Sequence, residues 1–342
     1  MSAATLHNVS NYDKKGRNSL SIFRSWSTLV VDVISFSLVF IVSLLFVFNT
    51  FNLKPFERGF FCDDQSIMYP YKDDTVSNTQ AAAIAVLVFP IVAFFVEPLY
   101  VFTCMRNNNH SNWTITKIAL KSFYSLVLLY LLGGALMQSI VAMVKLSAGR
   151  LRPNFFAWCI PDYNVTNCDV RGGGHINDFV CTNTDTDAVD DAKQSFPSGH
   201  ASSAVYAFTY IAIYLDIRLR QQLKWRLYFR MIAPTLQSLL VIAALYVCLS
   251  RIQDNKHHPT DVLGGAVVGL VLCLITIFVW SREAMLDITG EISEEVPAIH
   301  AESFRTSPNN VNGSQNPIMQ SRYSIDNAGQ DNVTFDVPSS PL

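Results

Sequence analysis

Hydrophobic residues along this chain gather in long runs, and polar segments separate the runs. A helix needs about 20 apolar residues to cross the hydrocarbon core of a bilayer. Six runs approach or exceed this length, namely residues 29–51, 81–102, 123–144, 201–215 with their flanks, 231–249 and 262–280. The fourth run is the shortest, and it can span only if the serines and the histidine at its start are included. The pattern predicts an all-α fold, a six-span transmembrane helical bundle.

The polar segments divide the chain into three parts. Residues 1–25 are polar and basic, and we expect a cytosolic N-terminal segment there. Residues 26–282 hold the six runs and form the predicted membrane domain. Residues 283–342 are rich in Ser, Asn, Asp and Pro, a composition typical of disorder, and form a predicted cytosolic tail. Only 15% of all residues are charged, which is low for a soluble protein, and the net charge of −2 argues against a nucleic-acid partner.

The distribution of Lys and Arg predicts the orientation, because short basic loops stay in the cytosol. The basic loops are residues 1–25, 103–122 and 216–230. The segments then placed together on the opposite face are residues 52–80, 145–200 and 250–261. We therefore expect an integral, multi-pass protein of the plasma membrane or of endomembranes, with this face toward the extracellular space or the lumen. Asp32 and Glu97, which lie near or within runs, are expected at the membrane interfaces.

Two features of the predicted outer face suit an oxidising compartment. Asn164 begins the glycosylation sequon Asn-Val-Thr. The outer loops also hold four cysteines, which are Cys62, Cys159, Cys168 and Cys181. Disulfides form in such compartments, and four cysteines allow three pairings, among which the sequence does not choose.

Two polar clusters stand where runs meet outer loops. The first is Lys145 and Arg152, with a proline after the arginine; seven residues make about two helical turns, so both cations can project from one face. The second is the Pro-Ser-Gly-His sequence of residues 197–200, at the start of a predicted helix whose first N–H groups attract anions. Both clusters therefore favour the binding of a negatively charged group.

A third polar cluster follows the fifth run. It contains Arg251 directly after a serine, then His257 and, four residues later, Asp261. If His257 and Asp261 share a helical turn, they lie on one face. The carboxylate would then fix the tautomer of the imidazole and stabilise its charged form.

The three clusters together are suited to a phosphomonoester. Arg152 and Arg251 can hold phosphate oxygens bidentately, and Lys145 adds a point charge. The N–H groups of Ser198 and Gly199 can stabilise the charge that develops in an in-line displacement. One histidine can attack phosphorus while the other protonates the leaving oxygen. The sequence predicts no metal and no cofactor, because the cations stand where a metal would neutralise charge.

Each cluster also has a simpler interpretation. Residues 197–200 can merely cap a helix, and Lys145 can extend its ammonium group to the membrane interface. The adjacent histidines 257 and 258 can be metal ligands or a surface pair. The combination of all three clusters favours the phosphate site.

The complete pattern resembles the signature of the phosphatidic acid phosphatase type 2 superfamily, in its lipid phosphate phosphatase family. That signature reads K-x6-R-P, P-S-G-H and S-R-x5-H-x3-D, and the sequence matches it without a departure. The resemblance covers about residues 25–282 and implies six spans, an extracytosolic site and magnesium-independent hydrolysis of lipid phosphates. Typical substrates would be phosphatidate, lysophosphatidate, sphingosine 1-phosphate and ceramide 1-phosphate. The resemblance also implies that His257 is the nucleophile that becomes phosphorylated, Asp261 its orienting partner and His200 the acid.

Other functions stay open at this point. A catalytically silent lipid-binding or signalling relative would keep the fold but lose histidines or cations, and all of them are present here. A phosphatase for a soluble phosphomonoester is the other alternative. The expected partners are lipid phosphates and the bilayer, and the sequence decides neither the preferred lipid nor whether the chain forms a homo-oligomer.

Overall fold

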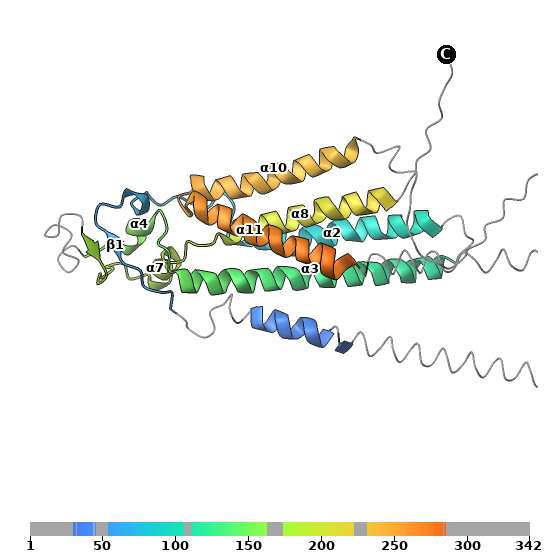
Figure 1. Cartoon of the computed structure of the whole chain (residues 1–342), viewed down its shortest axis with the longest axis horizontal. Coiled ribbons are helices and arrows are strands. Elements are labelled where there is room, and N and C mark those ends of the chain that lie inside the picture. The colour runs from blue at the N-terminus through green and yellow to red at the C-terminus, as the bar shows by residue number, and fades with distance from the viewer. Residues whose placement is uncertain are drawn as a thin grey trace, which may run out of the picture. The chain divides into compact units, whose positions relative to one another are not determined.

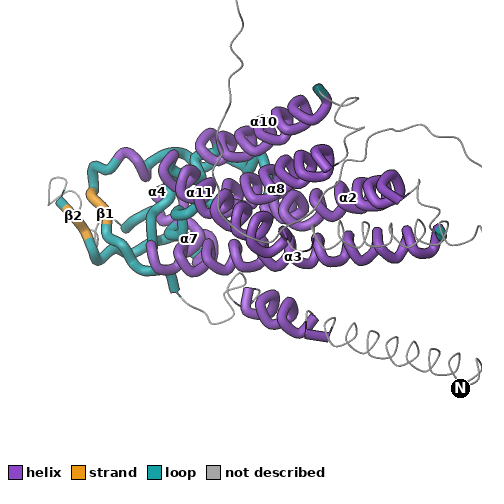
Figure 2. Tube along the Cα trace, turned by 45° about the vertical axis from the view of Figure 1, so that its right-hand side comes forward, coloured by secondary structure: helices purple, strands orange, loops and turns teal. Residues whose placement is uncertain are grey.

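A bundle of long helices dominates the computed structural model, which describes residues 30–31, 33–43, 45, 54–105, 111–162, 174–221, 231–282 and 284. The long helices lie side by side (Figures 1 and 2), and they are α2 (Asn78–Met105), α3 (Asn112–Ala148), α8 (Gly199–Gln221), α10 (Ile232–Gln253) and α11 (Pro259–Ile275), which continues as the π-helix η3 (Thr276–Trp280). The shorter elements lie at one end of the bundle, and they are β1 (Phe60–Phe61), η1 (Gln65–Ile67), α4 (Phe155–Cys159), β2 (His175–Ile176) and α7 (Thr186–Ala192). The predicted all-α fold is confirmed.

Among the residues that the structure describes, four helices are long and apolar enough to cross a membrane, namely Asn78–Met105, Asn112–Ala148, Ile232–Gln253 and Pro259–Trp280. They contain the second, third, fifth and sixth predicted runs. From the first run the structure describes a shorter apolar helix, Val33–Ser43. The side chain of Asp32 lies outside the described residues.

The fourth run forms α8, which takes the central position in the bundle. The helix begins at Gly199, so it includes the serines and the histidine as expected. Its 23 residues make a helix about 34 Å long. It packs against α2, α3, α10 and α11, and Ser202 and Ser203 are buried at these contacts. Neighbouring helices satisfy such polar groups; Gln138 Nε2, for example, donates to Ser203 Oγ over 2.9 Å.

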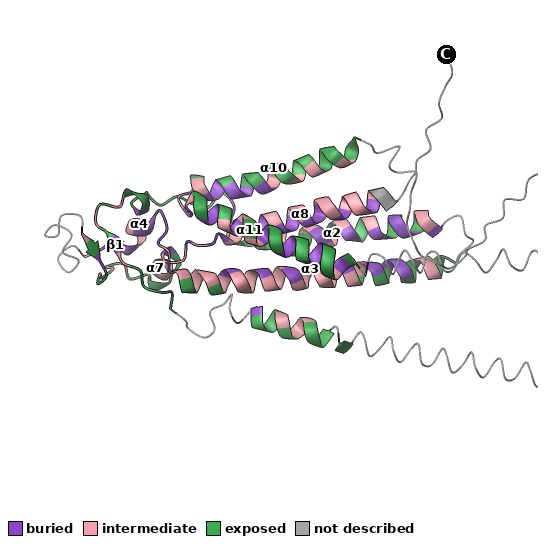
Figure 3. Ribbon diagram, viewed as in Figure 1, coloured by how far each residue is buried: buried purple, intermediate pink, exposed green. Residues whose placement is uncertain are grey.

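Apolar side chains also cover much of the outer surface of the helices. On α10, exposed side chains include Leu239, Val241, Ile242, Leu245 and Leu249. Figure 3 shows the exposed positions along the outer side of this helix. An apolar surface of this extent is typical of a helix that faces lipid.

Close contact between α8 and α11 depends on two glycines of α11. A Cβ atom at Gly265 would come within 2.3 Å of the Ser198 carbonyl oxygen, and one at Gly269 within 2.3 Å of the Ser202 carbonyl oxygen. Since real Cβ atoms do not approach so closely, only glycine allows this spacing. The contact holds the start of α8 against the start of α11.

Towards the opposite end of α8, Glu97 is completely buried between helices. Whether this depth in the bundle corresponds to a membrane interface, as expected from the sequence, stays a prediction. Glu97 Oε1 accepts from Arg218 Nε over 2.8 Å and from the Tyr214 hydroxyl over 2.6 Å. Ser122 of α3 also donates to the carboxylate. Arg218, predicted to lie in a basic loop, is therefore part of the bundle, where it joins α8 to α2.

The two long outer loops meet at the end of the bundle where the short elements lie. Phe60 pairs with Ile176 in the antiparallel ladder of β1 and β2. A disulfide joins Cys159 and Cys181, with the Cα atoms 4.6 Å apart. Cys62 is also disulfide-bonded. The fourth loop cysteine, Cys168, lies outside the described residues.

Two further predictions fall on residues that the structure does not describe. These are the sequon at Asn164 and, apart from residue 284, the tail of residues 283–342. The number of spans and the side of the membrane on which the outer loops lie stay predictions as well.

Candidate active site

The three polar clusters come together at the end of the bundle that carries the outer loops. Lys145 lies in the last turn of α3, and the chain then turns at Gly149, which has a left-handed φ of 53°. Backbone hydrogen bonds hold the following segments in place: Ser195 N donates to the Arg150 carbonyl oxygen over 2.8 Å, and Ser198 N donates to the Asp261 carbonyl oxygen over 3.0 Å. The ends of α3, α8 and α11 are thereby tied to one another.

His257 is buried just before α11, with 3% of its surface exposed. Its Nδ1 lies 2.7 Å from the carbonyl oxygen of Ser195. A carbonyl oxygen can only accept, so Nδ1 carries the proton and Nε2 keeps its lone pair. Burial and the nearby charges of Arg152 and Lys145 hold the pKa of His257 well below its usual range. The imidazole is therefore neutral at pH 7, with Nε2 able to act as a nucleophile.

The predicted contact between His257 and Asp261 is not formed. His257 precedes α11, which starts at Pro259, so the two residues do not share a helical turn. Asp261 is completely buried, and its Oδ1 accepts from Arg150 over 2.5 Å. Its Oδ2 accepts from the hydroxyl of Ser195 over 2.6 Å and from His258 N over 3.0 Å. Asp261 therefore acts on His257 only through Ser195, which binds the carboxylate with its side chain and the imidazole with its carbonyl group.

The start of α8 also differs from the prediction in one respect. Because the N–H group of Ser198 donates to Asp261, it is not available to a ligand. The hydroxyl of Ser198 instead accepts from Ala201 N over 3.4 Å at the start of the helix. At Gly199, a Cβ atom would meet only Val141, at 3.8 Å, so the backbone there stays accessible. First-turn N–H groups have no partner within their own helix, which leaves that of Gly199 as an anion donor.

His200 lies in the first turn of α8 and faces the segment that precedes α2. Its Nε2 is 3.1 Å from the carbonyl oxygen of Val76. This places a proton on Nε2, since the carbonyl group can only accept. The ring is partly buried.

Arg251 is buried between two carboxylates that the sequence analysis did not assign to the site. One terminal nitrogen donates to Asp74 Oδ1 over 2.8 Å and the other to Asp254 Oδ2 over 2.6 Å. Thr75 in turn holds Asp254 with its backbone N–H and its hydroxyl. A phosphate that uses both terminal nitrogens of Arg251 would share them with these carboxylates or displace one of them, and the side chain of Asp74 is the more exposed of the two.

Arg152 and Lys145 lie near His257, as their effect on its pKa requires. A terminal nitrogen of Arg152 pairs with Asp191 over 2.6 Å, while its buried Nε has no hydrogen-bond partner among the residues that the structure describes. Lys145 makes no ion pair within the described part of the chain. These cations therefore keep donors that an anion could use.

Lys256 is a further cation that the sequence analysis missed. Its Nζ lies 3.7 Å from Asp74 Oδ1 and 4.2 Å from the centre of the Tyr71 ring. The sequence could have indicated Lys256, because it directly precedes His257. It could also have indicated Asp254, because residues three apart, such as Arg251 and Asp254, are neighbours on the surface of a helix. No sequence signal linked Asp74 to the site, because its partner is far away in the chain. Ser195 lies two residues before the Pro-Ser-Gly-His sequence, but its role depends on Asp261, which is also far away in the chain.

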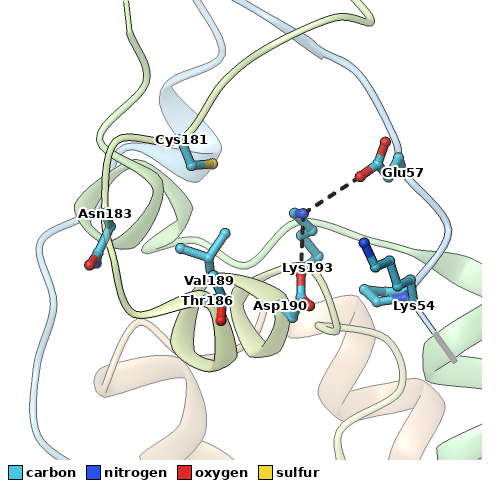
Figure 4. Close-up of a pocket in the computed structure, with 9 residues that line it drawn as sticks. Lys54, Glu57, Cys181, Asn183, Thr186, Val189, Asp190 and Lys193 are labelled. Carbon is cyan, nitrogen blue, oxygen red and sulfur yellow. Dashed lines mark hydrogen bonds and ion pairs between the residues drawn. The ribbon is translucent and has the colours of Figure 1, made fainter. Parts of the chain in front are cut away.

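A cavity at this end of the molecule is separate from the cluster of predicted site residues. It has a volume of about 360 Å³ and lies between the segment before β1 and α7 (Figure 4). Lys193 crosses it, with Nζ 3.2 Å from Asp190 Oδ1 and 3.9 Å from Glu57 Oε1. None of the predicted site residues lines this cavity.

Known proteins show similarity over most of the chain. Residues 122–284, which contain all three clusters, match the PAP2 superfamily. Phospholipid phosphatase 1 of Rattus norvegicus is 36% identical over 73% of this chain and 83% of its own length. Phospholipid phosphatase 2 of Rattus norvegicus is 33% identical over 81% of this chain and 96% of its own length. Phospholipid phosphatase 2 of Homo sapiens is 33% identical over 81% of this chain and 92% of its own length. No solved structure matches the chain. With this degree of identity over most of both chains, the protein belongs to the PAP2 superfamily.

Proposed function

We propose that this protein is an integral membrane phosphatase that hydrolyses lipid phosphates without a metal ion. The observation that carries the proposal is the neutral, buried imidazole of His257 beside Arg152 and Lys145. The names of the similar phospholipid phosphatases support a lipid substrate. Phosphatidate, lysophosphatidate and sphingosine 1-phosphate are the proposed substrates.

The proposed reaction has two steps. Nε2 of His257 attacks phosphorus, and the bond between phosphorus and the lipid oxygen breaks. With phosphate bound, His200 carries a second proton on Nδ1 and gives it to the departing oxygen, which leaves as the lipid alcohol, while Nε2–H stays on the Val76 carbonyl oxygen. Water then attacks the phosphohistidine, Nδ1 of His200 takes up a proton from that water, and inorganic phosphate leaves with His257 restored.

The cations have distinct proposed roles in this reaction. Arg251 and Arg152 bind the oxygens of the phosphoryl group, and Lys145 and the N–H group of Gly199 add charge stabilisation. Ser198 contributes indirectly, by fixing the start of α8 against Asp261. Asp261 and Ser195 are proposed to position His257 rather than to touch the substrate.

The test is phosphate release by purified protein in detergent with EDTA, using lipid phosphates and p-nitrophenyl phosphate. Activity on at least one lipid phosphate should survive chelation. His257→Ala should abolish hydrolysis of every substrate, because no phosphoenzyme can form. His200→Ala should lose much less activity on p-nitrophenyl phosphate than on a lipid phosphate, since an aryl oxide departs without a proton.

Each part of the proposal can fail separately in this experiment. Turnover that requires added Mg²⁺ contradicts the metal-independent mechanism. Selective rescue of His257→Ala by the aryl phosphate would exchange the roles of the two histidines. Hydrolysis of soluble phosphomonoesters alone would favour the soluble-substrate alternative, and no hydrolysis at all would favour a silent relative.

A further inference from the structure

An apolar groove runs between α2, α8 and α10, beside the candidate active site. It has a volume of about 580 Å³, within the range of about 300–1,000 Å³ that is usual for small-molecule sites. Its lining is mostly apolar and includes Val76, Ala83, Ile84, Phe208, Ala243 and Val247. A groove of this character fits a hydrocarbon chain rather than a polar ligand.

The floor of the groove is a packed part of the core. Val76 and Val247 are buried together with Ala204, and Ile84 and Phe208 pack against them. Tyr246, on the rim, is 58% exposed. The groove therefore has a solid apolar floor and an open side.

The open side is flanked by lipid-facing surfaces. On α2 the exposed neighbours of the groove include Val86 and Leu87, and on α10 they include Ile242 and Leu245. A chain could therefore enter from the hydrocarbon core of the bilayer without crossing water.

One end of the groove reaches the candidate active site. Val76 lines the groove, and its carbonyl oxygen lies 3.1 Å from His200 Nε2. Thr75, also in the lining, binds Asp254, the carboxylate that pairs with Arg251. A single residue thus separates the groove from the proposed acid.

The chemistry of the reaction requires the lipid on this same side. The oxygen that His200 protonates is the atom that joins phosphorus to the lipid, so the lipid must leave the site past His200. The cavity around Lys193 is lined in part by charged groups and does not suit a hydrocarbon. We infer that the groove between α2, α8 and α10 binds the hydrocarbon chain of the lipid substrate and thereby positions its ester oxygen; this inference rests on the proposed function.

The test fills the groove and compares two substrates. Ala83→Trp places a large side chain in the groove, whereas Ala82, the preceding residue of α2, is exposed and outside the lining, so Ala82→Trp is the matched control. For Ala83→Trp we expect kcat/KM to fall by at least about tenfold on a long-chain lipid phosphate and to stay within about twofold on p-nitrophenyl phosphate, because only the former must be positioned by its chain. Ala82→Trp should leave both values unchanged. Equal activity of Ala83→Trp and the parent on the long-chain substrate would overturn the inference.

A second measurement uses the unsubstituted protein and does not depend on how a variant folds. An alkylphosphonate with a diazirine in the middle of its chain should, after illumination, label peptides of α2 and α10 that line the groove. Labelling of α3 or α11 instead would overturn the inference, even if Ala83→Trp lost activity on both substrates. If the parent hydrolyses neither substrate, the proposed function fails, while the site of labelling still decides the location of the chain.

Discussion

At the scale of single residues, the environment of His257 decides what its side chain can do. Its Nδ1 is held by the Ser195 carbonyl oxygen, so its tautomer is set by the backbone and not by a carboxylate. Two cations and burial lower its pKa, which keeps the ring neutral. The phosphate that these cations attract would offset their charge when bound. The site thus favours the unprotonated ring that the proposed role of His257 requires.

The lowered pKa of His257 predicts how activity depends on pH. The groups that lower it are Arg152, Lys145 and His200, and the Ser195 carbonyl group opposes them. Only the neutral ring can attack, so activity is present above the folded-state pKa and is lost as the pH falls through it. Because that pKa lies below the usual value of about 6.5, we expect the acid limb of kcat/KM below this pH. The measurement is a pH profile corrected for the ionisation of the substrate, and a limb above about 6.5 would contradict this account.

The geometry of Arg251 predicts that lysine cannot replace it. Both terminal nitrogens are used at once, by Asp74 and Asp254, and a phosphate that displaces Asp74 would meet the same fork. Arg251→Lys keeps the charge but removes this geometry. We expect kcat/KM to fall by at least about tenfold, which is about 1.4 kcal/mol of transition-state stabilisation. The matched control is Arg282→Lys, at an exposed position beyond η3, which should leave kcat/KM unchanged. Near-normal kcat/KM of Arg251→Lys would show that the two-nitrogen geometry of the guanidinium is unimportant.

At the scale of secondary-structure elements, the active-site end depends on how closely α8 and α11 pack. The Ser198 carbonyl oxygen lies where a side chain of Gly265 would have to be. Ser198 N in turn donates to Asp261 in the first turn of α11. Any change in the spacing of the two helices therefore moves both His200 and the support of His257.

A substitution at Gly265 tests this dependence. Gly265→Ala forces a Cβ atom against backbone, which cannot yield as a flexible side chain would, so we expect destabilisation of about 1–3 kcal/mol and a loss of activity on every substrate. Gly134→Ala is the matched control, because its Cβ atom would meet Tyr206 at an ordinary 3.6 Å. The measurements are thermal unfolding in detergent and kcat/KM on p-nitrophenyl phosphate. Equal behaviour of the two variants would mean that the spacing of α8 and α11 is not critical.

At the scale of the whole molecule, the bundle has two differently built ends. One end carries the outer loops, the disulfide between Cys159 and Cys181 and the candidate active site. Towards the other end of α8, Glu97 and Arg218 form a buried ion pair. A disulfide needs an oxidising compartment, which agrees with the orientation predicted from the basic loops.

This orientation predicts which parts of the chain are accessible from outside a cell. Asn164 should carry glycan, because its loop lies on the predicted outer face. Protease added to intact cells should leave the tail of residues 283–342 uncut, and permeabilised cells provide the control in which the tail is cut. An unmodified Asn164 together with a tail cut in intact cells would invert the topology.

By itself, the sequence determined the class of fold and predicted where the site lies. Runs of apolar residues are local features, so they located the long helices, including the need for α8 to include the histidine near its start. The spacing of the three clusters also predicted that Lys145, Arg152, His200 and His257 form one site; the structure brings them to one end of the bundle, and their roles stay proposals. These inferences need only neighbours in the sequence, because hydropathy and helical spacing act over a few turns.

The tertiary structure alone decided which groups bind one another. Asp261 pairs with Arg150 at a separation of 111 residues, and Arg251 pairs with Asp74 at a separation of 177 residues. These contacts removed the expected pairing of Asp261 with His257. The buried ion pair of Glu97 and the apolar groove likewise arise where separate helices meet. The physical reason is that the partners of a buried polar group are chosen by packing between distant segments, which no local pattern encodes.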